Sequence, residues 1–179
     1  MPHIHTEPGQ HDHTNSIYIV RTDGDEPLVW LHMHRKLHRL LAAGGHIELD
    51  ETPWQSIAHE LTEESGYTLS DLELLQPEDR IKSFTDNVIL HPQPVVVCTQ
   101  NPVAGHYHID SAYAFITDQE PSLAIGATES HDIRWLSRAE LDNLDVETEV
   151  FANTQKVYQY ILDVCLPKWD RVSSQSFEL

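Results

Sequence analysis

The sequence predicts an α/β fold in which helices pack on a sheet. Alternating apolar segments typical of strands occur along most of the chain, one strongly capped helix lies among them, and a longer helical segment lies near the C-terminus. Elements mixed in this way form layers around one core. The length of 179 residues fits a single domain. We expect an N-terminal segment (residues 1–14), a core (15–165) and a C-terminal tail (166–179).

The first two expected strands form a hairpin. Residues 16–22 (SIYIVRT) alternate and are rich in β-branched and aromatic side chains, and residues 28–33 (LVWLHM) supply the returning strand. The turn signal Asp23-Gly24-Asp25 lies between them. Four further strands are expected, at residues 72–76, 94–99, 107–117 and 132–136.

The best-defined helix is expected at residues 52–65. Thr52 is a good N-cap, Pro53 suits the first turn, and Gln55 completes a capping box with Thr52. Gly66 is a suitable C-terminal stop, because glycine adopts left-handed backbone angles at little cost.

Two further helices are expected nearer the C-terminus. Ser137 and Glu140 form a second capping box, which opens a short helix. A longer helix is expected at residues 147–165, ended by Pro167, because a proline ring interrupts helical hydrogen bonding.

The composition excludes several classes of partner. The chain carries 11 Lys and Arg against 29 Asp and Glu, a formal charge of −18 with its 13 His neutral. This charge repels nucleic-acid polymers and anionic membrane surfaces. The longest apolar stretches, such as residues 95–98, fall far short of the ~20 residues that span a bilayer, and the first residues lack a signal-peptide pattern. The two cysteines, Cys98 and Cys165, match no disulfide framework, so we expect a cytoplasmic protein.

Three carboxylates share one face of the helix expected at 52–65. Glu60, Glu63 and Glu64 stand at positions i, i+3 and i+4, so their side chains are neighbours. Their mutual repulsion and their place near the negative end of the helix dipole each cost roughly a few tenths to 1 kcal/mol. A divalent cation would remove both penalties, and a cluster of oxygen ligands suits Mg²⁺ or Mn²⁺ better than zinc. Taken alone, the pattern is also typical of a solvated acidic face.

The segment around these carboxylates resembles the signature of the Nudix hydrolase family. Residues 45–67 are GHIELDETPWQSIAHELTEESGY. The family signature is Gly, five residues, Glu, seven residues, Arg-Glu, an aliphatic, any residue, Glu-Glu, any residue, Gly, and an aliphatic or aromatic residue. Two positions depart from the family: His59 replaces the Arg, and Ala43 replaces a Pro before the double glycine. The positions that match are Gly45, Glu51, Glu60, Leu61, Glu63, Glu64, Gly66 and Tyr67.

The resemblance implies a fold and an activity. The fold would be a Nudix-type α/β/α sandwich with a mixed β-sheet, covering residues 15–165. The activity would be Mg²⁺-dependent hydrolysis of a diphosphate bond in a nucleoside diphosphate derivative or another nucleotide, with Mn²⁺ as a substitute metal. The expected partner is therefore a small nucleotide or diphosphate, and relatives in the family often form homodimers.

The resemblance also implies roles for individual residues. Glu60, Glu63 and Glu64 are expected as metal ligands, the Gly44 carbonyl as a further ligand, and Glu51 as a supporting residue or indirect ligand. Either Glu60 or Glu64 is expected to orient or deprotonate the attacking water.

Two more features complete the expected catalytic site. His59 is expected to donate hydrogen bonds beside the glutamates, where the family's Arg holds them in place. Family members often take another carboxylate from a downstream loop. Glu129 and Asp110 are both candidates for that ligand, and the sequence does not choose between them.

Phosphate contacts are expected from the basic stretch before the signature. Arg35, Lys36 and Arg39 lie on the chain that leads into the site, and a guanidinium suits bidentate recognition of phosphate. His46 follows the glycine pair and is expected near the substrate. An ordinary solvated basic loop accounts for the same cations equally well.

Histidines recur outside the signature. Two histidines at positions i and i+2 of a strand turn both rings to one side, which permits a transition-metal site. We favour ordinary structural roles, because no cysteine or close carboxylate set completes a known zinc motif. These histidines are His3, His5, His11, His13, His106 and His108.

Two other functions are compatible with the same fold. The replacement of Arg by His59 leaves open a catalytically weak Nudix-fold protein that binds a nucleotide or metal in a regulatory role. A Nudix-fold isomerase acting on isoprenoid diphosphates would call for a catalytic cysteine. Cys98 lies in an apolar strand segment typical of a core, which argues against the isomerase.

Overall fold

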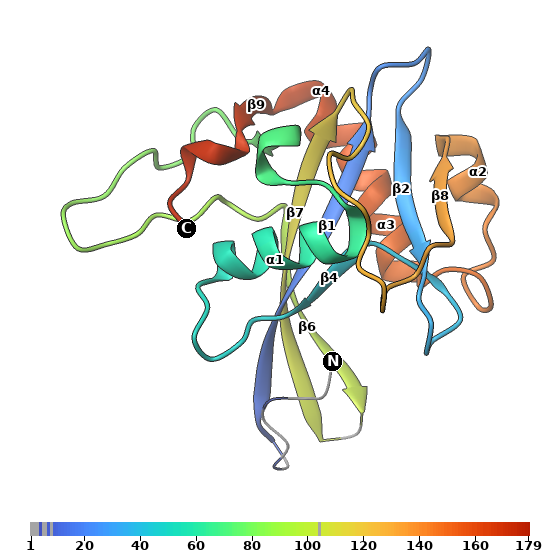
Figure 1. Cartoon of the computed structure of the whole chain (residues 1–179), viewed down its shortest axis with the longest axis horizontal. Coiled ribbons are helices and arrows are strands. Elements are labelled where there is room, and N and C mark those ends of the chain that lie inside the picture. The colour runs from blue at the N-terminus through green and yellow to red at the C-terminus, as the bar shows by residue number, and fades with distance from the viewer. Residues whose placement is uncertain (1–3, 5–6, 8, 104) are drawn as a thin grey trace.

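The chain folds into one mixed sheet with helices on both faces (Figure 1). The computed structural model describes residues 4, 7, 9–103 and 105–179. Within these residues the helix α1 (Pro53–Ser65) covers one face of the sheet and α3 (Ala152–Tyr160) covers the other. The expected α/β class, with a mixed sheet between two helical layers, is confirmed.

Two long strands form the centre of the sheet. β1 (His11–Arg21) pairs in parallel with β7 (His106–Thr117) along its whole length. The shorter strands are β2 (Leu28–Met33), β3 (Leu40–Leu41), β4 (Ala43–His46), β5 (Glu73–Gln76), β6 (Val96–Val103), β8 (Ile133–Leu136) and β9 (Asp170–Ser173). The order is β3-β2-β1-β7-β5-β9, and in addition β4 pairs with β1, β6 with β7 and β8 with β2. Among the strands that the structure describes, every strand pairing except β1 with β7 is antiparallel.

The remaining helices are short. α2 (Arg138–Asn143) follows β8, while a π-helical turn, η2 (Ile161–Cys165), and α4 (Leu166–Lys168) continue α3. No helix among the described residues combines the length and apolar character needed to cross a membrane. Single 3-10 turns occur at η1 (Leu69–Asp71) and η3 (Ser174–Ser176).

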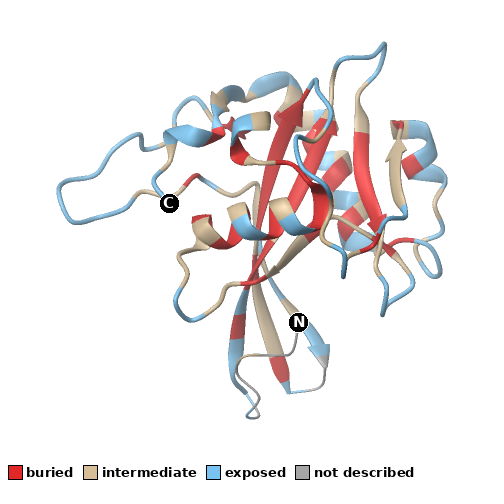
Figure 2. Cartoon of the chain, viewed as in Figure 1, coloured by how far each residue is buried: buried red, intermediate tan, exposed pale blue. Residues whose placement is uncertain are grey.

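The alternation of side chains along β1 divides the core between the two faces of the sheet. Ile17 and Ile19 belong to the cluster that contains α1, whereas Tyr18 and Val20 belong to the cluster that contains α3. Figure 2 shows the buried residues concentrated on the central strands and on the helix faces turned toward them. Helical members of the two clusters include Trp54, Ile57 and Leu61 on α1, and Tyr158 on α3 with Ile161 at the start of η2 on the opposite side.

Helix α1 begins and ends where the sequence predicts. The Thr52 side chain accepts from the Gln55 N–H, and the Gln55 side chain accepts from the Thr52 N–H, so both halves of the capping box are present. Gly66 ends the helix with φ +74°. A Cβ at this position would clash with the Leu123 carbonyl oxygen, so glycine is required there for space as well as for conformation.

Several boundaries differ from those expected. β1 begins at His11, inside the N-terminal segment, because its polar first residues pair with β7 and β4. β9 lies within the expected C-terminal tail and pairs with β5. α3 begins at Ala152, because N–H groups of residues 148–150 donate instead to the Asp145 carbonyl. Pro167 does not end the helical segment, which continues through Lys168.

Candidate functional site

A cavity of about 250 Å³ lies beside the C-terminal half of α1. Its walls come from α1, from the glycine pair of β4, from the loop after β2 and from the loop that precedes β8. The three signature glutamates that share one helix face all line it, so their expected convergence holds in three dimensions. The lining residues are His32, His34, Arg35, Lys36, Gly44, Gly45, Glu60, Glu63, Glu64, Thr128, Glu129 and Ser130.

Strand β4 approaches α1 closely at Gly44. The Gly44 N–H donates to Glu64 Oε2 over 2.7 Å, which fixes the orientation of that carboxylate. Gly44 has φ +140°, and a Cβ there would clash with the Asn15 carbonyl oxygen. Only glycine therefore lets the β4 backbone reach the carboxylate.

Two of the carboxylates in this cavity are buried. Burial raises the pKa of Glu60 to about 7 and the pKa of Glu64 to about 8, against the opposing effects of the His59 charge and the Gly44 N–H respectively. Glu63 is more open, with a side chain 54% exposed. Among the described residues, Glu60 Oε1 is buried and has no hydrogen-bond partner. Clustered hard oxygen donors with an unpaired buried oxygen fit a divalent cation.

His59 joins two other glutamates of the signature. Its Nδ1 atom lies 3.1 Å from Glu51 Oε1, and its Nε2 atom lies 3.2 Å from Glu63 Oε1. Partial burial acts to lower the pKa of His59, but the hydrogen bond to Glu63 and the charges of the glutamates raise it above its ordinary value. Glu51 itself does not line the cavity. It contacts the site through His59, which is the arrangement expected of a supporting residue.

The two downstream carboxylates lie in different surroundings. Glu129 lines the cavity, because the Gly126 N–H donates to the Glu63 carbonyl and holds the loop against the end of α1. Asp110 lies on β7, accepts hydrogen bonds from Thr14 and Ser16, and does not line this cavity. Burial raises the pKa of Asp110, and the bonds from the two hydroxyl groups oppose that rise.

The basic residues before the signature also separate. Arg35 and Lys36 line the cavity, and the Arg35 guanidinium donates to the Thr128 carbonyl over 2.5 Å. The Arg39 guanidinium instead lies over the Phe151 ring, 4.7 Å from its centre, outside the cavity lining. His46 ends β4 and also lies outside the lining, 3.5 Å from Asp12.

Two histidines that line the cavity were not expected there from the sequence. His32 and His34 lie at the end of β2 and in the residue after it, on the cavity wall. Burial, with a smaller contribution from the charge of His34, lowers the pKa of His32 to about 4. Their i, i+2 spacing beside the basic stretch is the signal that could have identified them. His3 and His5 lie outside the described residues, and His11 and His13 are exposed on β1.

Comparison with known proteins identifies the relatives of this fold. The family model described as NUDIX domain matches residues 12–159. A hydrolase of the NUDIX family from Clostridium perfringens is 27% identical, with a TM-score of 0.66 over 86% of this chain and 97% of that one. An Ap4A hydrolase from C. elegans (14% identity, TM-score 0.60, 84% and 95% covered) shares the fold. So does the NUDIX domain of Shewanella oneidensis NrtR complexed with ADP ribose (15%, 0.59, 84% and 86%). No curated protein sequence matches the chain.

Proposed function

Because the chain belongs to the NUDIX domain family, we propose that it is a Mg²⁺-dependent hydrolase of a diphosphate bond in a nucleoside diphosphate derivative or another nucleotide. One observation carries the proposal: three glutamates of the signature (Glu60, Glu63 and Glu64) line the same cavity as two cations of the preceding stretch, Arg35 and Lys36. A diphosphate is itself anionic, so a site for it needs positive charge as well as carboxylates.

The metal ligands in this proposal are the carboxylates of the cavity. Glu60, Glu63, Glu64 and Glu129 would hold Mg²⁺, or Mn²⁺ in its place, together with the Gly44 carbonyl. The cation would neutralise charge on the diphosphate and lower the pKa of the attacking water. Glu129 is preferred to Asp110 because Glu129 lines the cavity with all three glutamates, whereas Asp110 lines an adjoining pocket that only Glu64 of the three reaches.

The residues of the chain then bind and orient the reactants. Arg35 and Lys36, which line the same cavity, contact phosphate oxygens, and Arg39 is left out because it stacks on Phe151. Glu60 or Glu64 orients the water and accepts its proton. The oxygen of water bonds to phosphorus, the bridging P–O bond breaks, and the released phosphate takes the electron pair.

His59 and Glu51 support this site without touching the substrate. His59 contacts Glu63 from outside the cavity, and Glu51 contacts the other ring nitrogen of His59. The pair restricts the Glu63 carboxylate, as the permanently charged Arg of the family would. We therefore class both as positioning residues.

A second function remains a candidate because His59 stands where the family has Arg. In that case the same cavity binds a nucleotide without hydrolysing it. Nucleotide binding without turnover in the presence of Mg²⁺ would favour this binding function over hydrolysis.

The test is product release from a panel of nucleotides, dinucleotides and nucleotide sugars, with and without Mg²⁺. We expect metal-dependent turnover of at least one compound, and its near-complete loss in Glu63→Gln. Glu26→Gln, an exposed glutamate in the turn between β1 and β2, is the matched control and should keep full activity. Folded protein with no turnover of any panel compound contradicts the proposal for those substrates, and full activity in Glu63→Gln contradicts the ligand assignment.

A further inference from the structure

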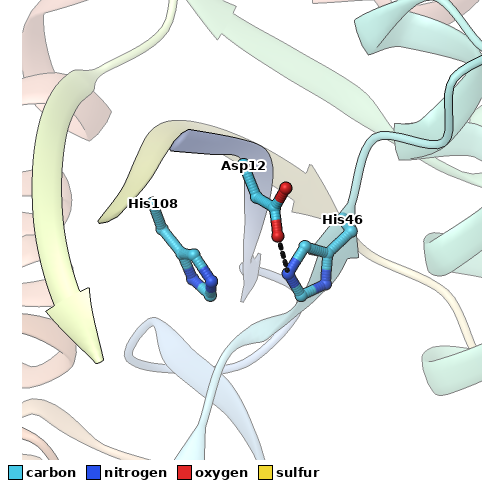
Figure 3. Close-up of side chains that lie close together, drawn as sticks. All are labelled: Asp12, His46 and His108. Atoms are coloured by element: carbon cyan, nitrogen blue, oxygen red, sulfur yellow. Dashed lines mark ion pairs between the residues drawn. The ribbon is translucent and has the colours of Figure 1, made fainter. Parts of the chain in front are cut away.

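A second group of metal-ligating side chains lies outside the carboxylate cavity. Asp12 on β1, His46 at the end of β4 and His108 on β7 each offer a ligand atom, and the three atoms lie within 4.8 Å of one another. Figure 3 shows the three side chains gathered from neighbouring strands, with His46 paired to the carboxylate. Of the three residues, only His46 was expected in the catalytic site from the sequence, and it does not line the carboxylate cavity.

The register of the sheet explains why these residues meet. β7 and β4 pair with opposite edges of β1, so all three strands run side by side. His108 is the partner of Asp12 across one edge, and His46 is the partner of Thr14 across the other. Since Asp12 and Thr14 are two residues apart on one strand, they share a face of the sheet. The same face therefore presents Asp12, His46 and His108 together.

The distances suit a small transition-metal ion. Asp12 Oδ2 lies 3.5 Å from His46 Nε2. With bonds of about 2.0–2.1 Å, tetrahedral zinc separates its ligand atoms by about 3.3 Å. All separations in the group lie within 4.8 Å, so the widest exceeds that figure by no more than about 1.5 Å, which a side-chain rotation can close. His106 Nε2 lies 3.2 Å from Asp12 Oδ2 and helps to hold the carboxylate in place.

Burial and ligand type point to zinc rather than magnesium. Asp12 is fully buried and His46 nearly so. A carboxylate removed from water needs a compensating charge, and a divalent cation supplies it while the imidazoles stay neutral. Imidazole nitrogen with one carboxylate is a ligand set of zinc and similar ions, whereas Mg²⁺ prefers oxygen ligands alone.

We propose that Asp12, His46 and His108 form a Zn²⁺ site, distinct from the carboxylate cavity, that ties together β1, β4 and β7. The ion would join the strands at the end of the sheet where β1 and β7 extend together with β6 (Figure 1). It would also fix the end of β4, directly after the glycine pair that lines the carboxylate cavity. A purely structural ion pair between Asp12 and protonated histidines is the competing explanation.

The test uses the untagged chain of 179 residues, stripped of metal with a chelator. Zn²⁺ affinity is measured by competition with a chromophoric chelator in millimolar Mg²⁺, and Co²⁺ is added as a spectroscopic substitute. We expect one Zn²⁺ per chain, the intense visible bands of tetrahedral Co²⁺, and a higher unfolding temperature with Zn²⁺. His108→Gln and Asp12→Asn should each weaken Zn²⁺ binding at least about tenfold and remove the Co²⁺ bands.

Matched variants separate this site from other zinc ligands. His13→Gln changes an exposed histidine next to Asp12 but on the other face of β1, and it should bind Zn²⁺ as the wild type does. Glu63→Gln should also leave Zn²⁺ affinity unchanged. Absence of stoichiometric Zn²⁺ binding, or equal affinity in wild type and in a folded His108→Gln variant, would overturn the proposal. An equal loss of Zn²⁺ affinity in His13→Gln would overturn the proposal as well.

Discussion

The Nε2 atom of His59 lies 3.2 Å from Oε1 of Glu63, one turn further along α1. The other ring nitrogen contacts Glu51, so the imidazole fills the space between two glutamates of the signature. The replacement of the family's Arg therefore keeps a hydrogen-bond donor beside the carboxylate. What changes is the shape of the donor and the permanence of its charge.

Removal of the His59 ring should loosen Glu63. We expect His59→Ala to lower kcat/KM at least about tenfold and to raise the Mg²⁺ concentration needed for half-maximal activity. Loss of a group that orients a metal ligand typically reduces metal affinity or activity by about this factor or more. His59→Arg should stay close to wild type, since a guanidinium can contact both glutamates. Mg²⁺ titrations of activity for the three proteins make the comparison. If His59→Ala matches wild type in both quantities, the positioning role is wrong.

Gly44 should tolerate no side chain. We expect Gly44→Ala to lower the free energy of unfolding by about 2 kcal/mol or more, because the backbone is left-handed there and the added Cβ meets the Asn15 carbonyl oxygen. Urea unfolding measures the loss. Gly24→Ala is the control, because the nearest atom to a Cβ there is 3.8 Å away, and its effect should stay within about 1 kcal/mol. Equal effects at the two glycines would contradict this account of β4.

Substitutions at Glu129 and at Asp110 should affect different properties of the protein. Glu129→Gln should raise the Mg²⁺ requirement for activity about tenfold with little change in stability, because Glu129 lines the cavity in a surface loop. Asp110→Asn should instead lower the unfolding temperature, since its carboxylate accepts from Thr14 and Ser16. Activity titrated with Mg²⁺ and thermal unfolding distinguish the two. A raised Mg²⁺ requirement in Asp110→Asn alone would reverse the assignment.

Buried His32 should make the protein acid-sensitive. Its pKa is about 4 in the folded chain against 6.5 as the ordinary value. A lowered pKa means that the unfolded chain binds the proton first, so stability is complete above pH 6.5 and is lost as the pH falls toward 4. The difference of about 2.5 pKa units corresponds to roughly 3 kcal/mol at most.

Comparison of variants isolates this effect. The raised pKa values of Glu60 and Glu64 act in the opposite direction, destabilising the metal-free fold as the pH rises from 4.5 toward 8. We therefore compare His32→Gln with wild type by urea unfolding of metal-free protein at pH 7 and pH 4.5. The variant should lose less stability on acidification, and His13→Gln, on the exposed face of β1, should behave as wild type. An unchanged acid loss in His32→Gln would refute the assignment.

The sequence predicted correctly those elements whose ends are determined by residues close to them in the chain. Thr52, Gln55 and Gly66 define the ends of α1 through contacts within the helix itself, and their spacing is visible in the sequence. The first residues of β1 carry no such local signal. Residues such as Asp12 and Thr14 are polar, and they are strand residues because β7, about 95 positions later in the chain, pairs with them.

The same distinction holds for the candidate site. Helical spacing alone brings Glu60, Glu63 and Glu64 to one face, so the centre of the site was predictable. The choice between Glu129 and Asp110 depends on a backbone contact from Gly126 to Glu63, which no spacing encodes. The grouping of Asp12 with His46 and His108 likewise depends on strand register. The sequence alone favoured an ordinary structural role for His108 and a place near the substrate for His46.

In the proposed function, the carboxylate cavity binds the divalent cation used in hydrolysis. The most direct measurement is anomalous diffraction from a crystal grown with Mn²⁺ and a non-hydrolysable nucleotide. We predict an anomalous peak in contact with the carboxylates of Glu60, Glu63 and Glu64, on the same side as Glu129, with the diphosphate facing Arg35. A nucleotide bound with no Mn²⁺ peak among these glutamates, or an Mn²⁺ peak found only elsewhere, would contradict the proposed metal site.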